Sequence, residues 1–267
     1  MRRCRPLLGT FVEIDADRGI EAGFAAIERV HRLMSAHEPD SDVSRINRFA
    51  HIEPIAVDPW TARVIERALH WSKLSYGAFD IVRAGRSAVV GGRLPRHAGQ
   101  PAPEAAHWTW LEIQGVSVRL LKAGCIDLGG IAKGAAVEQA VSAMRAAGAT
   151  QGLVNAGGDL AAFGPQPWVV AVADPVTRRP IVELSVSNEA VATTAVIDGS
   201  SAHLTDESPW TSVTVRAANA CDADALTKIV WVAPANVRDV LAHARASAFG
   251  IRADGRVEDI VAEALAA

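Results

Sequence analysis

The sequence has few cysteines, and their arrangement excludes a disulfide-stapled fold. Only three occur among 267 residues, Cys4, Cys125 and Cys221. An odd number at such wide spacing does not form a disulfide framework, and no two of them have the spacing of metal ligands. We therefore expect three separate thiols, a pattern that fits a reducing compartment.

Long apolar runs are also missing. No stretch approaches the roughly 20 apolar residues of a membrane-spanning helix. The segment Met1–Pro6 is basic, but Gly9 and Thr10 come soon after it, so it is not followed by the apolar core of a signal peptide. The sequence predicts no membrane span and, as given, a cytoplasmic protein. A periplasmic or lipid-anchored protein is the alternative if a leader has been removed.

A strongly basic surface is absent too. The net charge is −3 and no basic block occurs, which argues against a nucleic-acid partner. Hydrophobic residues make up 49% and charged residues 21%, as in ordinary globular proteins. The chain is long enough to bury a sizeable core.

Strand patterns come in neighbouring runs rather than in strict alternation with helices, which predicts an α+β fold with mostly antiparallel sheets and packed helices. One domain over residues 1–267 is expected, with two closely packed subdomains as an open alternative. Asp58 and Pro59 form a helix start. Trp108 and Trp110 alternate along an expected strand and are assigned to the core. The segment 84–106 is expected to be a loop. Strands are expected at 7–15, 108–113, 116–121, 151–155, 168–173, 181–187, 190–195, 211–217 and 247–252, and helices at 18–36, 43–47, from 58, 131–147, from about 222 and 235–246.

The most informative segment runs from Ile126 to Gly134, with the sequence IDLGGIAKG. Paired glycines let backbone approach a ligand, and the following helix start, with Lys133, suits a phosphate. A glycine turn that merely packs a helix on a strand is equally compatible with the spacing. The segment is neither a dinucleotide fingerprint nor a Walker loop, which argues against a nicotinamide oxidoreductase. A second pair, Gly157-Gly158, predicts a tight turn.

Two groups of polar residues could carry chemistry in the last third of the chain. Asp206 lies close enough to His203 in sequence to orient its ring as a base. Asp224 and Thr227 share a helix face and form a hard-oxygen pair suited to Mg²⁺. On the residues alone, an N-terminal capping cluster around Asp222 and Asp224 is the favoured interpretation.

Seven segments occur in the order found in a known family. They are Leu7–Thr10, Met34-Ser35 with Ser41–Asn47, Gly77–Asp80, Asp127–Gly134, Asn155–Asp159, His203–Asp206 and Ala223–Leu226. Together they make the chain resemble the FAD:protein FMN transferases, the ApbE family, over nearly its whole length. The resemblance implies an ApbE-like, T-fold-related architecture. It also implies transfer of FMN from FAD to a Thr or Ser hydroxyl, with Mg²⁺ required and AMP released.

The resemblance also implies roles for individual residues. His203 is the expected general base, Asn47 helps to separate transfer from hydrolysis, and Asp224 serves both catalysis and metal binding. The expected metal-binding positions are Gly130 through its carbonyl, Asp224 and Thr227. The expected FAD contacts are Leu8, His37, Ala78, Phe79, Asp80, Asp127, Lys133 and Leu204. The expected partner is a flavoprotein or redox subunit that carries the target Thr or Ser.

This sequence departs from the family pattern at several positions. Most members have threonine four residues after the metal aspartate, where this chain has Lys228. Lys228 could displace a metal or supply charge in its place. Leu8 and His37 replace a frequent methionine and a frequent aromatic. The family's serine-glycine pair is Thr194-Ala195 here.

Two alternatives to transfer remain open from the sequence. One is hydrolysis of FAD by water to FMN and AMP at the same site, against which Asn47 argues. The other is a non-catalytic FAD-binding or flavin-delivery protein, for which the Lys228 departure is the best support.

Overall fold

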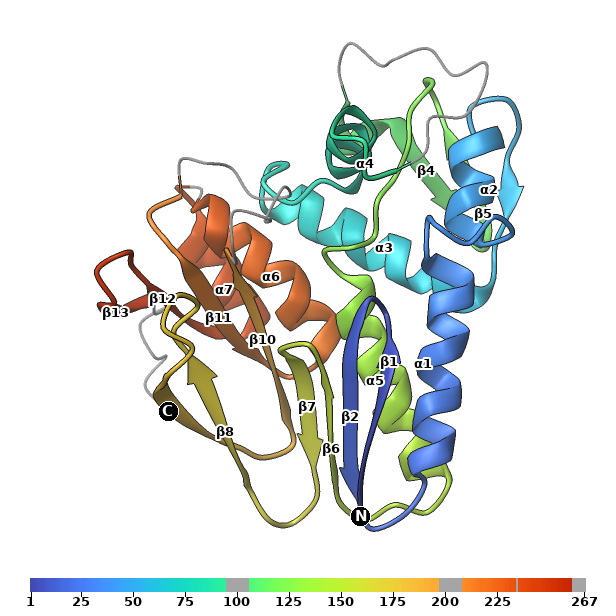
Figure 1. Cartoon of the computed structure of the whole chain (residues 1–267). Helices are drawn as coiled ribbons and strands as arrows, with labels where there is room; N and C mark the ends of the chain where they lie inside the picture. Colours follow the sequence, from blue (N-terminus) through green and yellow to red (C-terminus); the bar gives the residue numbers. More distant parts are fainter. Residues whose placement is uncertain (95–105, 197–207, 234, 261–267) are drawn as a thin grey trace. The chain divides into compact units, whose positions relative to one another are not determined.

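A computed structural model describes residues 1–94, 106–196, 208–233 and 235–260. The chain divides into two compact units, one of residues 1–27 with 133–267 and one of residues 28–132. Helices and sheets both contribute, and every strand pair in the described ranges is antiparallel (Figure 1). The α+β fold class predicted from the sequence is confirmed. No helix within these ranges has the length and apolar character needed to cross a bilayer.

The first unit is built on an eight-stranded sheet with the order β1-β2-β6-β7-β10-β11-β12-β13. Short connections join three of the neighbouring pairs, β1-β2, β6-β7 and β12-β13, as antiparallel pairing allows. The strands are β1 (Arg2–Leu7), β2 (Thr10–Ala16), β6 (Gly152–Ala156), β7 (Asp159–Phe163), β10 (Glu189–Ala195), β11 (Ser212–Ala217), β12 (Ser247–Ile251) and β13 (Val257–Ile260).

The strand expected at 7–15 is in fact a hairpin. Leu7 pairs with Thr10, and the two residues between them, Leu8 and Gly9, have positive φ angles of 55° and 71°. Positive φ at both positions is what a tight two-residue hairpin loop requires. Glycine adopts this conformation readily, whereas a leucine does so only at a steric cost, which is why the apolar pattern alone predicted one continuous strand.

Helices cover one face of this sheet. They are α1 (Ile20–Met34), whose first half belongs to this unit, α5 (Ala132–Ala146), α6 (Ala220–Val232) and α7 (Val237–Ala244). Helix α6 packs against β10 and β11 and is buried over most of its length. Its buried residues include Asp222, Asp224 and Thr227 as well as apolar side chains, so this core helix carries polar groups that need partners.

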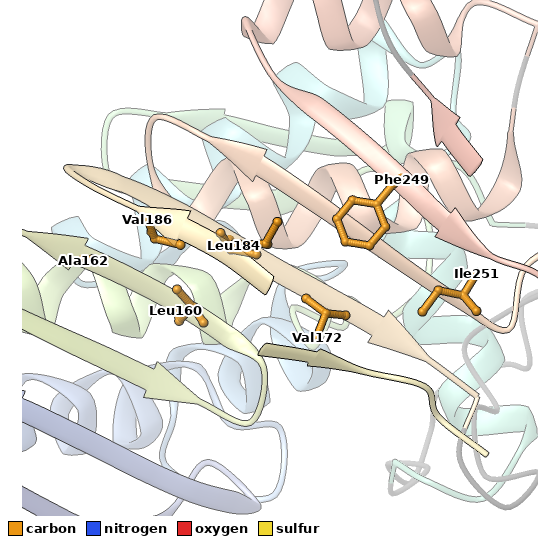
Figure 2. Close-up of a cluster of buried hydrophobic side chains, with 8 residues drawn as sticks. Leu160, Ala162, Val172, Leu184, Val186, Phe249 and Ile251 are labelled. Atoms are coloured by element: carbon orange, nitrogen blue, oxygen red, sulfur yellow. The ribbon is translucent and has the colours of Figure 1, made fainter. Parts of the chain in front are cut away.

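A two-stranded hairpin covers part of the other face. Strands β8 (Trp168–Ala173) and β9 (Pro180–Val186) form it, and their side chains meet residues of β7, β10 and β12 in a buried apolar cluster (Figure 2). Leu160 and Ala162 of β7 belong to this cluster. Since side chains alternate along a strand, Asp159 and Ala161 face the helix side. Strand β7 was missed in the sequence because all five residues are buried and no polar alternation marks it.

The second unit holds the rest of α1 and a small three-stranded sheet, with the order β3-β5-β4. The sheet packs with α2 and α3, and its strands are only two to four residues long. The remaining elements are α2 (Asp42–Phe49), β3 (Ile55–Ala56), α3 (Pro59–Leu74), α4 (Ile81–Val90), a 3-10 turn η1 (Trp108–Trp110), β4 (Leu111–Gln114) and β5 (Ser117–Leu120).

Local signals in this unit were correct for α2, α3 and β5 and wrong in two places. Asp58 caps α3 by accepting a hydrogen bond from the Trp60 amide at 2.8 Å, as expected. The expected loop at 84–106 begins instead inside α4. Trp108 and Trp110 lie in the 3-10 turn and are half-buried rather than core residues on a strand. All three cysteines lie in described segments and none forms a disulfide.

Candidate functional site

In the second unit, the approach to the glycine-rich segment is held by Asn47. Its side-chain amide donates to the Ile126 carbonyl at 3.0 Å, and its side-chain oxygen accepts from the Ile126 amide at 2.7 Å. Asn47 is 4% exposed. The Asn47 side chain thus satisfies both backbone polar groups of the buried residue Ile126, as a neighbouring strand would. Asn47 therefore anchors the chain one residue before Asp127.

Helix α4 holds the same segment from another side. The Asp127 amide donates to the Ile81 carbonyl at 2.9 Å. A side chain at Gly85 would come within 2.3 Å of the Cys125 carbonyl oxygen, so only glycine permits this approach. The Asp127 carboxylate then accepts from the Gly129 amide at 2.7 Å, which turns the chain toward Gly130.

Asp80 is a capping residue of α4. One carboxylate oxygen accepts from the Val82 and Arg83 amides, both at 2.9 Å, and the other accepts from the Trp108 amide at 3.0 Å. This satisfies donors at the helix start that have no partner within the helix. Asp80 and its neighbour Phe79 are buried. Both side chains therefore stabilise the unit, and a ligand could still contact these two residues through their backbone atoms.

The other predicted FAD contacts of this unit are more exposed. Ala78 is half-buried at the turn before Phe79, and His37 is exposed after the end of α1. The His37 amide donates to the Ser35 hydroxyl at 3.3 Å, and Gly130 is half-buried. These three residues are accessible to a ligand.

The first unit brings a lysine and a buried aspartate together at the start of α5. The Lys133 ammonium donates to an Asp159 carboxylate oxygen and forms an ion pair with it. The Asp159 side chain is fully buried, whereas that of Lys133 is 31% exposed. The second oxygen of Asp159, Oδ1, has no hydrogen-bond partner among the described residues. An orphaned buried oxygen is costly unless a ligand or water satisfies it.

A second lysine and aspartate pair lies beside the first. The Lys228 ammonium contacts Oδ1 of Asp224 at 2.5 Å, and the Gly134 amide donates to Oδ2 of Asp224 at 3.1 Å. The Asp224 side chain is fully buried. The sequence predicted that amides at the start of α5 could bind a ligand phosphate. The Gly134 amide instead donates to the Asp224 carboxylate of this chain.

These charged groups shift one another's pKa values. Burial raises the pKa of Asp159, the charge of Asp224 raises it further, and the two lysines only partly oppose this. Burial acts in the same direction on Asp224, but Lys228 and Lys133 outweigh it and the net pKa is lowered. Burial would lower the pKa of Lys133, yet the two carboxylates raise it above its ordinary value. Lys133 is therefore a permanent positive charge near neutral pH.

Thr227 is engaged by its neighbours. Its hydroxyl lies 2.7 Å from the Asp224 carbonyl oxygen, to which it donates, and 2.7 Å from the Thr194 hydroxyl. Thr194 belongs to β10, at the position where the family pattern has serine. The hydroxyl pair links α6 to the sheet that it covers.

The favoured sequence interpretation of this region, a capping cluster, holds for Asp222 but not for Asp224. Asn219 caps α6 by accepting from the Asp222 amide at 2.9 Å, and the Asn219 side chain donates to the Asp222 carboxylate at 2.7 Å. Asp224 lies further along the helix and joins the ion pairs instead. Its burial and partners give it a role that capping does not explain.

Two hairpin loops of this unit contain residues in the left-handed backbone conformation, with positive φ angles. Leu8 is half-buried in the β1–β2 loop. Gly157 and Gly158 join β6 to β7 with φ angles of 66° and 100°, as the predicted tight turn requires. A side chain at Gly157 would come within 2.6 Å of the Thr10 hydroxyl. Asp159 follows this turn directly, so the turn helps to position it.

Three residues with predicted roles lie outside the described residues: His203, Leu204 and Asp206. The general base and one FAD contact therefore stay predictions from the resemblance. Within the described ranges, no three His, Cys, Asp or Glu side chains gather in a way that could hold a metal ion.

Comparison with known proteins identifies the family. The sequence model of the ApbE family matches residues 8–249. The chain belongs to the ApbE family. This range includes every residue to which a role was assigned above, and the family resemblance seen in the sequence is confirmed.

Curated ApbE relatives match part of the chain. An FAD:protein FMN transferase of Haemophilus influenzae is 28% identical over an alignment of 171 residues, and the match covers 57% of this chain and 49% of the relative. One of Treponema pallidum is 27% identical over an alignment of 208 residues, and that match covers 67% of this chain and 57% of the relative. The chain thus spans about half the length of the curated relatives it matches.

Solved ApbE structures match nearly the whole chain. The ApbE protein of Thermotoga maritima has a TM-score of 0.82 at 27% identity, and the match covers 97% of this chain and 96% of that one. A flavin transferase ApbE of Vibrio cholerae has a TM-score of 0.82 at 21% identity and covers 98% and 97%. The ApbE fold therefore extends over the described residues.

The residues that the resemblance assigns to Mg²⁺ do not fit a bound metal in this arrangement. Asp224 has an ammonium on one oxygen and an amide on the other, and the Thr227 hydroxyl bonds to two oxygens of the chain. A magnesium ion requires oxygens at about 2.0–2.1 Å in near-octahedral geometry, and the Lys228 ammonium occupies the space beside Oδ1 of Asp224 where such an ion would lie. The magnesium requirement stays a prediction from the resemblance.

Asp159 is the site residue whose role sequence reasoning missed. It was part of a family segment, yet it had no assigned function. The available signal was an aspartate at the head of the apolar run from Leu160 to Phe163. A carboxylate in a buried strand needs a partner, and here Lys133 is that partner.

Proposed function

We propose that this chain transfers FMN from FAD to a serine or threonine hydroxyl of an acceptor protein and releases AMP. The observation that carries the proposal is the family match over residues 8–249, together with relatives named FAD:protein FMN transferases. The charged cluster at the start of α5 supports it, because a fixed positive charge at Lys133 suits a pyrophosphate substrate.

The reaction breaks one phosphoanhydride bond and forms one phosphoester bond. The acceptor hydroxyl oxygen attacks the FMN-side phosphorus, the bond from this phosphorus to the bridging oxygen breaks, and AMP leaves with that oxygen. The hydroxyl proton passes to a base, for which His203 is the candidate. A positioned base contributes roughly 10²–10⁴-fold to such a step.

Lys133 has the task of stabilising negative charge on the phosphoryl oxygens. Asp159 holds its ammonium and keeps it protonated. The ammonium remains partly exposed, so it can contact a ligand as well as Asp159. Preorganised charge of this kind stabilises a transition state without reorganisation during the reaction.

Hydrolysis of FAD by water is the first alternative, since it uses the same groups. Asn47 is the discriminating residue. We expect Asn47→Tyr to raise AMP release without acceptor modification relative to transfer. Because the Asn47 side chain holds Ile126, the ratio must be measured on folded variant protein. An unchanged ratio would remove Asn47 from the selection of the acceptor over water.

The deciding experiment incubates purified protein with FAD, with and without an acceptor protein that carries a flavinylation-type threonine. AMP release and acceptor mass are measured together, in Mg²⁺ and in chelator. A gain of one FMN unit with equal AMP supports transfer. AMP without a mass gain favours hydrolysis, and tight FAD binding without AMP in any condition favours a flavin-binding protein.

A further inference from the structure

We propose that the Lys228 ammonium takes the place of a divalent cation beside Asp224, so that this site carries its own positive charge and binds no Mg²⁺ there. The binding half of the proposal concerns only the chain's own residues. Its catalytic half, transfer without a divalent metal, rests on the proposed function.

Lys228 is placed by the helix itself. It follows Asp224 by four residues on α6, and residues at this spacing share one helix face. Its ammonium contacts Oδ1 of Asp224 at 2.5 Å. A lysine ammonium is a compact point charge, so it occupies the space on that oxygen that a metal ion would need. A metal could bind Oδ1 only after displacing the ammonium.

The other ligands that a metal would use are also engaged. Oδ2 of Asp224 accepts from the Gly134 amide at 3.1 Å, which holds the carboxylate in a fixed orientation. The Thr227 hydroxyl lies between the Asp224 carbonyl and Thr194. Freeing these oxygens would leave a buried amide or hydroxyl without its partner, which is unfavourable.

The charge of the cluster is already balanced. Two fully buried carboxylates, Asp159 and Asp224, face two ammonium groups, Lys133 and Lys228. A buried carboxylate is stable only when paired. A divalent cation at Asp224 would meet the Lys228 ammonium directly and feel the charge of Lys133, which also acts on Asp224, so both lysines would repel it. Removing the Lys228 ammonium would leave Oδ1 of Asp224 without its positively charged partner and accessible to a metal ion.

The first experiment measures divalent-cation binding and needs no substrate. Mn²⁺ is titrated into purified protein and followed by electron paramagnetic resonance, which separates free from bound ion. We compare the wild type with Lys228→Thr and with Lys73→Thr, a control that removes an exposed lysine from α3. We expect Lys228→Thr to bind Mn²⁺ at least about tenfold tighter than the other two proteins.

Further variants locate the site and protect the test from misfolding. Adding Asp224→Asn to Lys228→Thr should abolish the gained binding. Lys228→Met keeps the length of the stem and loses only the charge, and it serves if the threonine variant does not fold. One Mn²⁺ bound by the wild type and lost in Asp224→Asn would overturn the proposal. A folded Lys228 variant that gains no Mn²⁺ site would also count against it.

The second experiment measures AMP release from FAD in the presence of acceptor. The wild type should keep its rate within about twofold when a chelator replaces Mg²⁺. Lys228→Thr should lose AMP release in chelator and recover it with Mg²⁺. A wild type that is inactive in chelator and restored by Mg²⁺ would overturn the catalytic half. A wild type that releases no AMP in any condition would refute the proposed function, and the Mn²⁺ titration would still decide the binding half.

Discussion

The Gly134 amide donates a hydrogen bond to the Asp224 carboxylate at 3.1 Å, across ninety positions of sequence. This bond joins the first turn of α5 to the middle of α6. The two helices approach so closely that a side chain at Gly134 would come within 2.1 Å of the Ala220 carbonyl oxygen. The glycine after Lys133 therefore serves helix packing, and the lysine before it is aimed by that packing.

Gly134→Ala should destabilise the protein by about 1–3 kcal/mol, because the added methyl group meets backbone that cannot move without separating two helices. Urea unfolding followed by circular dichroism measures the loss. Gly124→Ala is the matched control, since a side chain there would meet no atom closer than 3.8 Å. Equal stability of the two variants would show that the α5–α6 contact is not tight in solution.

Asn47→Ala should lower the free energy of unfolding by about 1–3 kcal/mol. The reason is that it leaves the buried amide and carbonyl of Ile126 without partners. Asn47→Asp keeps an acceptor for the Ile126 amide and loses only the donor to the Ile126 carbonyl. Comparing the stability of the two variants therefore separates the contributions of the two hydrogen bonds. Urea titration of the three proteins tests this. A loss below the error of the titration would refute the anchoring role.

Asp17 should make stability depend on pH. A hydrogen bond from the Thr150 hydroxyl is the largest cause that lowers the pKa of Asp17, from 3.8 to about 2. A carboxyl with a lowered folded pKa stabilises the protein above pH 3.8, and this contribution is lost as the pH falls toward 2. Thr150→Val should therefore be less stable than the wild type near neutral pH.

The difference between Thr150→Val and the wild type should shrink as the pH falls through the same window and vanish below it. Urea unfolding at several pH values measures it, and a carboxyl NMR titration of Asp17 checks the pKa directly. A difference that stays constant from neutral to acidic pH would mean that the Thr150 hydroxyl acts by some route other than the ionised carboxylate.

His203→Ala should slow AMP release and acceptor modification by roughly 10²–10⁴-fold while FAD binding persists, as expected for loss of a general base. His243→Ala is a suitable control, since His243 is exposed near the end of α7. Rates are compared at saturating FAD and acceptor. A His203→Ala rate close to that of the wild type would remove this residue from the chemistry.

Much of the fold followed from local signals. The Asp58-Pro59 helix start and the Gly157-Gly158 turn were readable because capping and left-handed glycine involve neighbouring residues only. The run from Ile81 to Val90 was misjudged, since Gly85 disfavours a helix by propensity. Its packing against the Cys125 backbone explains the glycine, and that packing partner lies forty positions away in the sequence.

The sequence by itself determined the family, the α+β class and a set of polar residues at characteristic spacing. It could pair Asp224 with Thr227 and Lys228 because helical periodicity alone places them on one face. Only the tertiary structure decided that Asp159 pairs with Lys133 and that the Gly134 amide donates to the Asp224 carboxylate. Those contacts join β7, α5 and α6, and no local pattern specifies which buried carboxylate meets which distant donor. The physical reason is that burial makes pairing obligatory, while the choice of partner depends on how the helices pack on the sheet.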